Sequence, residues 1–290
     1  MAIEYQVLNT VEAYRSRISE VAQLFSTVFR RAFPADAWNQ WYLDNPYGEP
    51  YVALGYSGDQ LVGHHALVPQ TLVGQGGERL RYLLSVSLMV HPHFRNLRVF
   101  VAMVDALHRS AQEEGTPFIL AFPNTQAAPL WEKVYAYRPL VQTELCNWRP
   151  TKFSAAASGS MGRHEEMRSK PQCSCPEDSV HWNWRSQTNH ARCCSVGTTL
   201  RLAYKVIEPA TLMLLDVWIN EEQGAAERLA GFAHGLGFTE VRLTRYHAAQ
   251  LRIPDADLTP HEGYVVRFFG FPLAEEVPDI RFSLLLSDVF

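Results

Sequence analysis

Hydrophobic positions in the first 150 residues alternate between the spacing of strands and that of helices. The pattern predicts strands at 5–8, 51–56, 61–73, 80–90, 117–122 and within 138–149. Helices are expected at 18–33, 35–43, after a turn near residue 95, and at 126–136. Strands that alternate with helices in this way favour a mixed α/β sheet with helices on both faces.

A polar stretch divides the chain. Residues 151–172 are small and polar, without apolar periodicity, which is typical of a linker or a long surface loop. Beyond it, strands are expected at 199–206, 211–219, 240–243, 263–271 and 281–286, with a helix at 221–235. We therefore expect a first domain at 1–150, a linker at 151–175 and a second half at 176–290.

The segment 87–122 carries the strongest local signal. Leu88, Met89 and Val90 end an apolar strand, Arg95 lies in a short basic turn, and a helical pattern follows. The first turn of a helix presents unpaired N–H groups and the positive end of its dipole, so this turn suits a phosphate.

Three ordered motifs resemble the GNAT superfamily of N-acetyltransferases over residues 18 to 140. The first is the pattern V-x-P-x-x-R, matched by Val90, Pro92 and Arg95. The second is N-x-x-A-x-x-L-Y-E-K, matched by Asn124, Ala127, Leu130, Glu132 and Lys133. The third is the strand, turn and strand that precede the first motif, here WYLDNPYGEP and LVGHHALV.

The resemblance implies a site for acetyl-CoA as co-substrate. The backbone of Leu88, Met89 and Val90 would contact the thioester, and Asn124 would lie beside the pantetheine arm. The turn for the pyrophosphate would comprise Arg95, Asn96, Leu97, Arg98, Val99 and Phe100.

Two positions depart from the family pattern. Arg98 and Phe100 stand where the family has small residues, so Arg98 either adds a cation to the pyrophosphate or blocks the cleft. Trp131 replaces the tyrosine that protonates the departing thiolate, and an indole N–H cannot do so. Tyr135, one helical turn further on, is the remaining candidate for this acid.

No residue stands out as the general base. The candidates are His64, His65, Ser87, His91 and Glu132. Adjacent His64 and His65 point to opposite faces of a strand, so only one of them can face a cleft.

Charge and cysteine content exclude several classes of protein. A net charge of -4 without a basic cluster argues against nucleic-acid binding. No apolar run is long enough for membrane insertion, and the N-terminal residues lack the pattern of a signal peptide, so a cytoplasmic location is expected. The five cysteines lack the spacing of structural zinc sites, so no metal is expected.

The second half resembles the degenerate half of tandem GNAT proteins. Trp184 and Arg185 match a W-R segment of those proteins, and Ser287, Asp288 and Phe290 match their tail. The chain is thus expected to acetylate a primary amine on a small molecule, with an amino sugar or a cell-surface polysaccharide precursor preferred. The aromatic residues Trp38, Trp41, Tyr42 and Tyr47 either stack on such a sugar or pack the two short helices. Two alternatives remain: a non-catalytic binding module with a filled cleft, and a peptidoglycan-type aminoacyltransferase.

Overall fold

The computed structural model describes residues 3–150, 173–174, 179–188 and 190–287. The expected linker therefore lies outside the described residues except for Cys173 and Ser174, as do Asp288 and Phe290 of the tail. None of the described helices is both long and apolar enough to span a bilayer.

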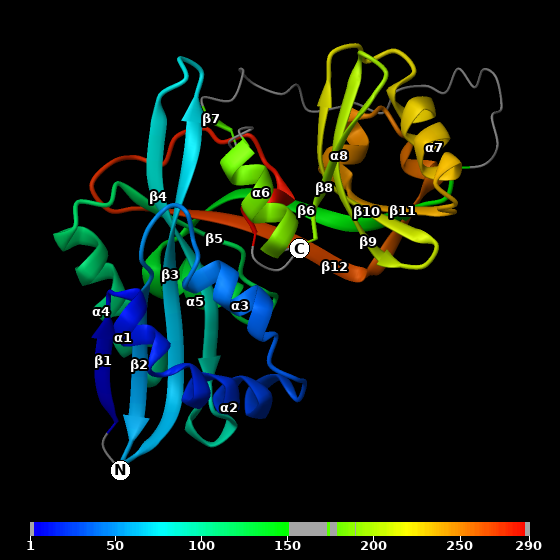
Figure 1. The fold of residues 1–290 in the computed structure, drawn as a ribbon. Coiled ribbons are helices and arrows are strands. Elements are labelled where there is room, and N and C mark those ends of the chain that lie inside the picture. The colour runs from blue at the N-terminus through cyan, green and yellow to red at the C-terminus, as the bar shows by residue number, and fades with distance from the viewer. Residues whose placement is uncertain (1–2, 151–172, 175–178, 189, 288–290) are drawn as a thin grey trace.

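A single mixed sheet runs through both halves of the chain (Figure 1). Its order is β1-β2-β3-β4-β5-β12-β6-β11-β10-β9-β8, and the short β7 (Cys173–Ser174) pairs with β3. The strands of the first half are β1 (Glu4–Leu8), β2 (Tyr51–Ser57), β3 (Gln60–Gly74), β4 (Arg79–Val90), β5 (Phe118–Ala121) and β6 (Arg138–Trp148). Those of the second half are β8 (Arg192–Val196), β9 (Leu200–Glu208), β10 (Thr211–Ile219), β11 (Glu240–Thr244) and β12 (Leu258–Pro272).

Helices cover both faces of the first half of the sheet, as the pattern predicted. On one face lie α1 (Val11–Arg15), α2 (Ile18–Phe29) and α3 (Ala35–Tyr42), whose buried residues share a core with those of β2, β3 and β4. On the other face, α4 (Leu97–Glu113) and α5 (Ala128–Tyr135) form a separate core with the same strands. Met103 of α4 packs directly against the backbone of Gly63. A Cβ at position 63 would lie 2.8 Å from the Met103 sulfur, so the close packing favours glycine there.

The two halves exchange strands. β12 lies between β5 and β6 and pairs antiparallel with both, so the last strand of the chain enters the sheet of the first half. β6 in turn pairs with β11. The division expected at residue 150 falls directly after β6 in the chain, but in space β6 lies among strands of the second half.

The remaining described elements are three helices and three short 3-10 turns. The helices are α6 (Ser179–Thr188), α7 (Ala225–Gly235) and α8 (Arg245–Gln250), and the turns are η1 (Pro92–Phe94) in the first half, η2 (Asp255–Asp257) and η3 (Leu284–Leu286). Phe282 and the three leucines of η3 are buried in a core to which α1, α2 and α3 and strands of both halves contribute. The strand expected at 281–286 is therefore wrong: this apolar run packs as an irregular segment and a 3-10 turn rather than pairing in the sheet.

Candidate functional site

The candidate site is the V between β4 and β5, the place where these two neighbouring strands stop pairing. The two strands pair in parallel only from Leu83 to Ser85, which face Ile119 to Ala121. β5 ends there, whereas β4 continues to Val90. Within β4, Ser85, Ser87, Leu88 and Val90 are partly exposed, whereas Val86 and Met89 between them are buried. We interpret this partial exposure as the result of the missing pairing with β5.

A bulge interrupts the regular geometry of β4 at this place. Ser87 has a φ of 50°, in the left-handed region that a non-glycine residue adopts only when its surroundings hold it there. The pairing register between β3 and β4 shifts between His64 and Ala66, so one additional residue of β4 is accommodated opposite them. Beyond Ser85, β4 remains paired with β3 as far as Val90, whereas its pairing with β5 has ended.

A buried chain of hydrogen bonds braces the bulge. The Nδ1 atom of His64 lies 2.8 Å from the carbonyl oxygen of Ser87, which can only accept, so Nδ1 carries the proton. The Nε2 atom must then accept from the Tyr14 hydroxyl, 2.9 Å away, and the indole N–H of Trp38 donates to that hydroxyl, also at 2.9 Å. Tyr42 completes the brace by donating to the Ser87 hydroxyl at 2.6 Å.

This brace requires a neutral imidazole. His64 is fully buried, and burial lowers its pKa to about 4. Both of its ring nitrogens are engaged within the fold, so its lone pair does not face the V. Among the candidate bases, His64 is therefore placed where it holds the backbone of β4.

The turn after β4 leads directly to the N-terminus of α4. The Nε atom of Arg95 donates to the carbonyl oxygen of Val90 at 3.2 Å, which ties the turn to the end of β4. Asn96 caps α4, since its side-chain oxygen accepts from the Val99 N–H at 3.1 Å. Helix geometry leaves the N–H groups of Leu97 and Arg98 for a ligand.

Arg98 and Phe100 have different surroundings. Arg98 is exposed on the first turn of α4. Phe100 is buried in the core and meets the rings of Trp131 and Tyr135 at centroid distances of 5.4 and 5.8 Å. The small residues of the family pattern are thus replaced by one side chain that faces solvent and one that packs beneath the helix.

Asn124 follows β5 at the other arm of the V. Its side-chain oxygen accepts from the N–H groups of Gln126 and Ala127 at 3.0 and 2.9 Å, which caps the turn into α5. Asn124 is exposed, and its side-chain amide N–H groups have no partner among the described contacts. They are the part of this residue that a ligand could use.

Trp131 and Tyr135 of α5 occupy different surroundings. Trp131 is only 3% exposed and packs in the core. The hydroxyl of Tyr135 lies 2.7 Å from Asp105 Oδ1 and 3.0 Å from the carbonyl oxygen of Val101, both on α4. Burial and the Asp105 carboxylate raise the pKa of Tyr135, so its proton is held between the two helices.

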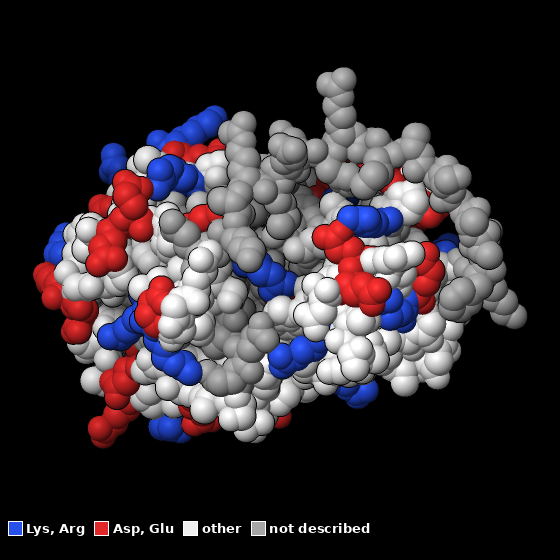
Figure 2. All heavy atoms as spheres, turned by 90° about the horizontal axis from the view of Figure 1, so that it is seen from above, with Lys and Arg blue, Asp and Glu red and all other residues white. Residues whose placement is uncertain are grey.

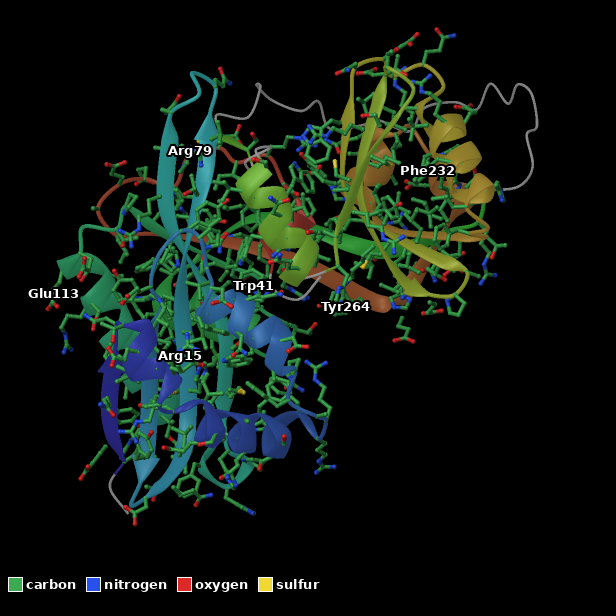
Figure 3. The ribbon with its side chains drawn as sticks, in the orientation of Figure 1. Arg15, Trp41, Arg79, Glu113, Phe232 and Tyr264 are labelled. Carbon is green, nitrogen blue, oxygen red and sulfur yellow. The ribbon has the colours of Figure 1, made fainter. Side chains whose placement is uncertain are left out.

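The aromatic residues of α3 pack in the core and do not form an exposed wall for a sugar. Trp38, Trp41 and Tyr42 are at most 6% exposed. Figure 3 shows Trp41 at the junction of α3 and α6. There it meets the ring of Trp184 at 4.8 Å and the guanidinium of Arg185 at 5.0 Å, and Arg185 donates to the carbonyl oxygen of Ser287. The W-R segment thus joins α3 to the end of the chain.

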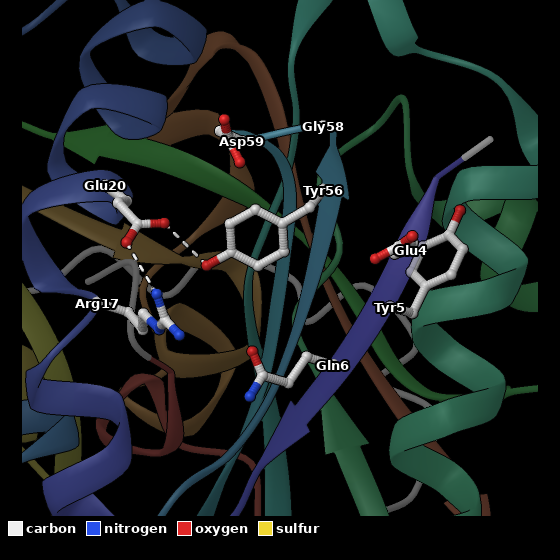
Figure 4. Close-up of a pocket in the computed structure, with 8 residues that line it drawn as sticks. All are labelled: Glu4, Tyr5, Gln6, Arg17, Glu20, Tyr56, Gly58 and Asp59. Carbon is white, nitrogen blue, oxygen red and sulfur yellow. Dashed lines mark hydrogen bonds and ion pairs between the residues drawn. The ribbon is translucent and has the colours of Figure 1, made fainter. Parts of the chain in front are cut away.

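A separate polar depression lies between α2 and the β1–β2 edge of the sheet (Figure 4). At its centre Glu20 accepts from the hydroxyl of Tyr56 at 2.8 Å and from Arg17 at 3.2 Å. Burial and the Glu20 carboxylate raise the pKa of Tyr56 to about 12. None of the residues predicted from the sequence lines this depression.

Charged side chains do not form a basic stripe on the face shown in Figure 2, where Lys and Arg are interspersed with Asp and Glu. Among the described residues, no group of three or more His, Cys, Asp or Glu side chains could hold a metal ion. Cys146, Cys173, Cys193 and Cys194 are free thiols.

Comparison with known proteins identifies the first half. Residues 11–135 match the family model of the acetyltransferase (GNAT) domain, which confirms the resemblance to the GNAT superfamily. No curated protein matches the sequence.

Solved structures extend the likeness of the fold to both halves. A probable N-acyltransferase from Enterococcus faecalis has a TM-score of 0.62 at 11% identity, over 94% of this chain and 73% of that one. The N-myristoyltransferase of Saccharomyces cerevisiae with bound myristoyl-CoA has a TM-score of 0.56 at 10% identity, over 92% and 78%. A tandem GNAT protein from the clavulanic acid biosynthesis pathway has a TM-score of 0.53 at 12% identity, over 95% and 100%. The chain therefore has a GNAT-type fold with a mixed sheet, and its length accommodates two GNAT-like halves.

Proposed function

We propose that the protein transfers an acetyl group from acetyl-CoA to a primary amine of a small molecule. The observation that carries this proposal is the V between β4 and β5, beside the bulge at Ser87. The N-terminus of α4 follows one arm of the V and Asn124 follows the other. Such a space suits an extended arm with amide groups that ends in a pyrophosphate.

The residues of this chain divide the work of binding. The N–H groups of Leu97 and Arg98, together with the Arg95 and Arg98 side chains, would hold the pyrophosphate. The amide N–H of Asn124 would donate to a carbonyl of the pantetheine. The backbone of Leu88, Met89 and Val90, freed from β5, would position the thioester and polarise its carbonyl.

The exposure of Arg98 supports this function over a non-catalytic module with a filled cleft. On the face shown in Figure 2, the interspersed charges also offer little to a tRNA, on which a peptidoglycan-type aminoacyltransferase depends. Because Trp38, Trp41 and Tyr42 are buried, they are not available to stack on a sugar ring. We therefore propose primary amines as the acceptor class and keep amino sugars as one member of it.

Tyr135 remains the sequence-based candidate for the acid. Its proton would have to leave the Asp105 carboxylate and the Val101 carbonyl to reach a thiolate.

The function is tested by turnover with a panel of primary amines that includes glucosamine, with release of the CoA thiol as the readout. Asn124→Ala should weaken acetyl-CoA binding by about 1 to 3 kcal/mol, because a buried amide of the cofactor loses its partner. Asn124→Asp is the matched variant, since its carboxylate oxygen can still accept from the N–H groups of Gln126 and Ala127 but offers no N–H. Both variants should bind acetyl-CoA weakly, while only Asn124→Ala should lose these two hydrogen bonds and unfold more readily. Acetyl-CoA affinity unchanged in both variants would remove Asn124 from the site.

A further inference from the structure

Ser85 lies at the vertex of the V. It pairs with Ala121, the last residue of β5, and the two strands part beyond this pair. Ser85 is partly exposed, although Leu84 and Val86 on either side of it are buried. Because side chains alternate along a strand, Ser85 shares the α4 and α5 face with Leu83, which packs in the core beneath those helices.

His65 of β3 holds this serine. Its ring is fully buried, its Nε2 atom lies 2.9 Å from the Ser85 hydroxyl oxygen, and its centroid lies 5.6 Å from that of Trp131. Its Nδ1 atom has no hydrogen-bond partner among the described residues.

The unpaired Nδ1 determines the direction of the hydrogen bond. A proton on Nδ1 would be a buried donor without an acceptor, a rarer and costlier arrangement than an unpaired acceptor. The tautomer that fits therefore carries its proton on Nε2 and donates to the Ser85 oxygen. The Ser85 O–H remains available to donate to a further group.

We infer that the Ser85 hydroxyl donates a hydrogen bond to the sulfur of bound acyl-CoA, with His65 as the residue that positions it. This inference rests on the proposed function. It assigns to Ser85 a task for which Trp131 is unsuited, since the indole is packed in the core and cannot supply a proton to a thiolate.

The step balances with solvent water. The amine nitrogen forms its bond to the carbonyl carbon, and the C–S bond breaks with its electron pair moving to sulfur. The Ser85 O–H stabilises the thiolate as it forms, and the oxygen keeps its bond from His65. The acceptor reacts as a neutral amine, and its nitrogen loses one proton to water as the amide forms. The CoA thiolate takes one proton from water.

The test measures the ionisation of the CoA thiol in the binary complex with CoA, which needs no acceptor. Thiolate absorbance in the ultraviolet, followed against pH, gives the pKa of the bound thiol. Ser85→Ala should raise this pKa by about one unit, a tenfold change in ionisation that corresponds to one hydrogen bond. Ser85→Thr keeps a hydroxyl and should leave the pKa of the bound thiol at the wild-type value. His65→Gln should raise this pKa by less than Ser85→Ala does, because its side-chain amide can still donate to Ser85.

Two further variants make the test specific. Ser110→Ala removes a hydroxyl that donates to a carbonyl within α4 and should leave the bound thiol unchanged. Tyr135→Phe tests the rival donor. A shift in Tyr135→Phe with none in Ser85→Ala would overturn the inference.

The outcomes separate this inference from the function on which it rests. Equal thiol pKa values in wild type and Ser85→Ala, with CoA bound to both, overturn the role of Ser85 and leave CoA binding in place. Absence of CoA binding to the wild type overturns the proposed function itself. In turnover, loss of the Ser85 hydroxyl should lower kcat at least tenfold with little change in the KM for acetyl-CoA.

Discussion

Replacing Asp216 by Asn should destabilise the protein by about 3 kcal/mol, because it leaves the guanidinium of Arg281 without its charged partner. Asp216 is fully buried on β10 and accepts from both terminal nitrogens of Arg281, at 3.0 and 2.6 Å. Burial raises the pKa of Asp216, while Arg281 and the Val217 N–H oppose that rise. Arg281 also donates to the carbonyl oxygen of Val217. The pair thus holds β10 to a segment whose next residues, Phe282 and the leucines of η3, pack in the core that both halves share.

Urea unfolding of the wild type and Asp216→Asn measures this loss. The matched control is Glu276→Gln, which removes one partner of an ion pair whose side chains are 56% and 80% exposed. Solvent screens that pair, so its loss should cost well under about 1 kcal/mol. Equal stabilities for Asp216→Asn and Glu276→Gln would show that the buried pair does not hold the segment around Arg281 to β10.

The free energy of unfolding should fall as the pH drops from about 6.5 to about 4. A histidine with a lowered folded pKa binds its proton first in the unfolded chain, so acid favours unfolding until the folded form also protonates. For His64, a folded pKa of about 4 against the usual 6.5 corresponds to about 3 kcal/mol. Burial lowers the pKa of His65, His108 and His247 as well, and these add to the same trend.

His64→Gln isolates the contribution of the brace at the β4 bulge. At pH 7.5 the variant should be less stable by about 1 to 3 kcal/mol, since Tyr14 and the Ser87 carbonyl lose well-placed partners. Its stability should then decline less steeply with acid, so the gap to the wild type narrows toward pH 4. His93→Gln, at an exposed histidine, is the control and should follow the wild-type curve. Parallel curves for His64→Gln and the wild type would contradict the brace.

The sequence predicted the elements with clear periodicity and missed those that depend on tertiary contacts. The strand at Thr211–Ile219 was predicted with its bounds, because its apolar run is long and bordered by turns. The helix at Ser179–Thr188 was missed, since its aromatic residues follow no helical stripe and are buried by contact with α3. The insertion of β12 between β5 and β6 is a pairing between distant segments, for which a single sequence holds no local signal.

In the candidate site, too, the sequence predicted the segments but not their detailed contacts. The motifs lie at the ends of β4 and β5 and at the start of α4. The bulge at Ser87 and the pair of Ser85 with His65 depend on strand register and on side-chain rotation. A serine and a histidine twenty residues apart form no recognisable pattern until the hairpin of β3 and β4 aligns them.

Calorimetric titration with CoA tests the central claim most directly, with wild type and Arg98→Gly side by side. Exposed Arg98 at the start of α4 should contact the pyrophosphate, so the wild type should bind CoA and the variant should bind it more weakly. The difference should shrink as salt screens the charges. At a hundredfold excess of CoA over its dissociation constant, binding should stabilise the wild type by about 2.7 kcal/mol. Absence of binding to both proteins at millimolar CoA, or binding only to Arg98→Gly, would contradict an open acyl-CoA site between β4 and β5.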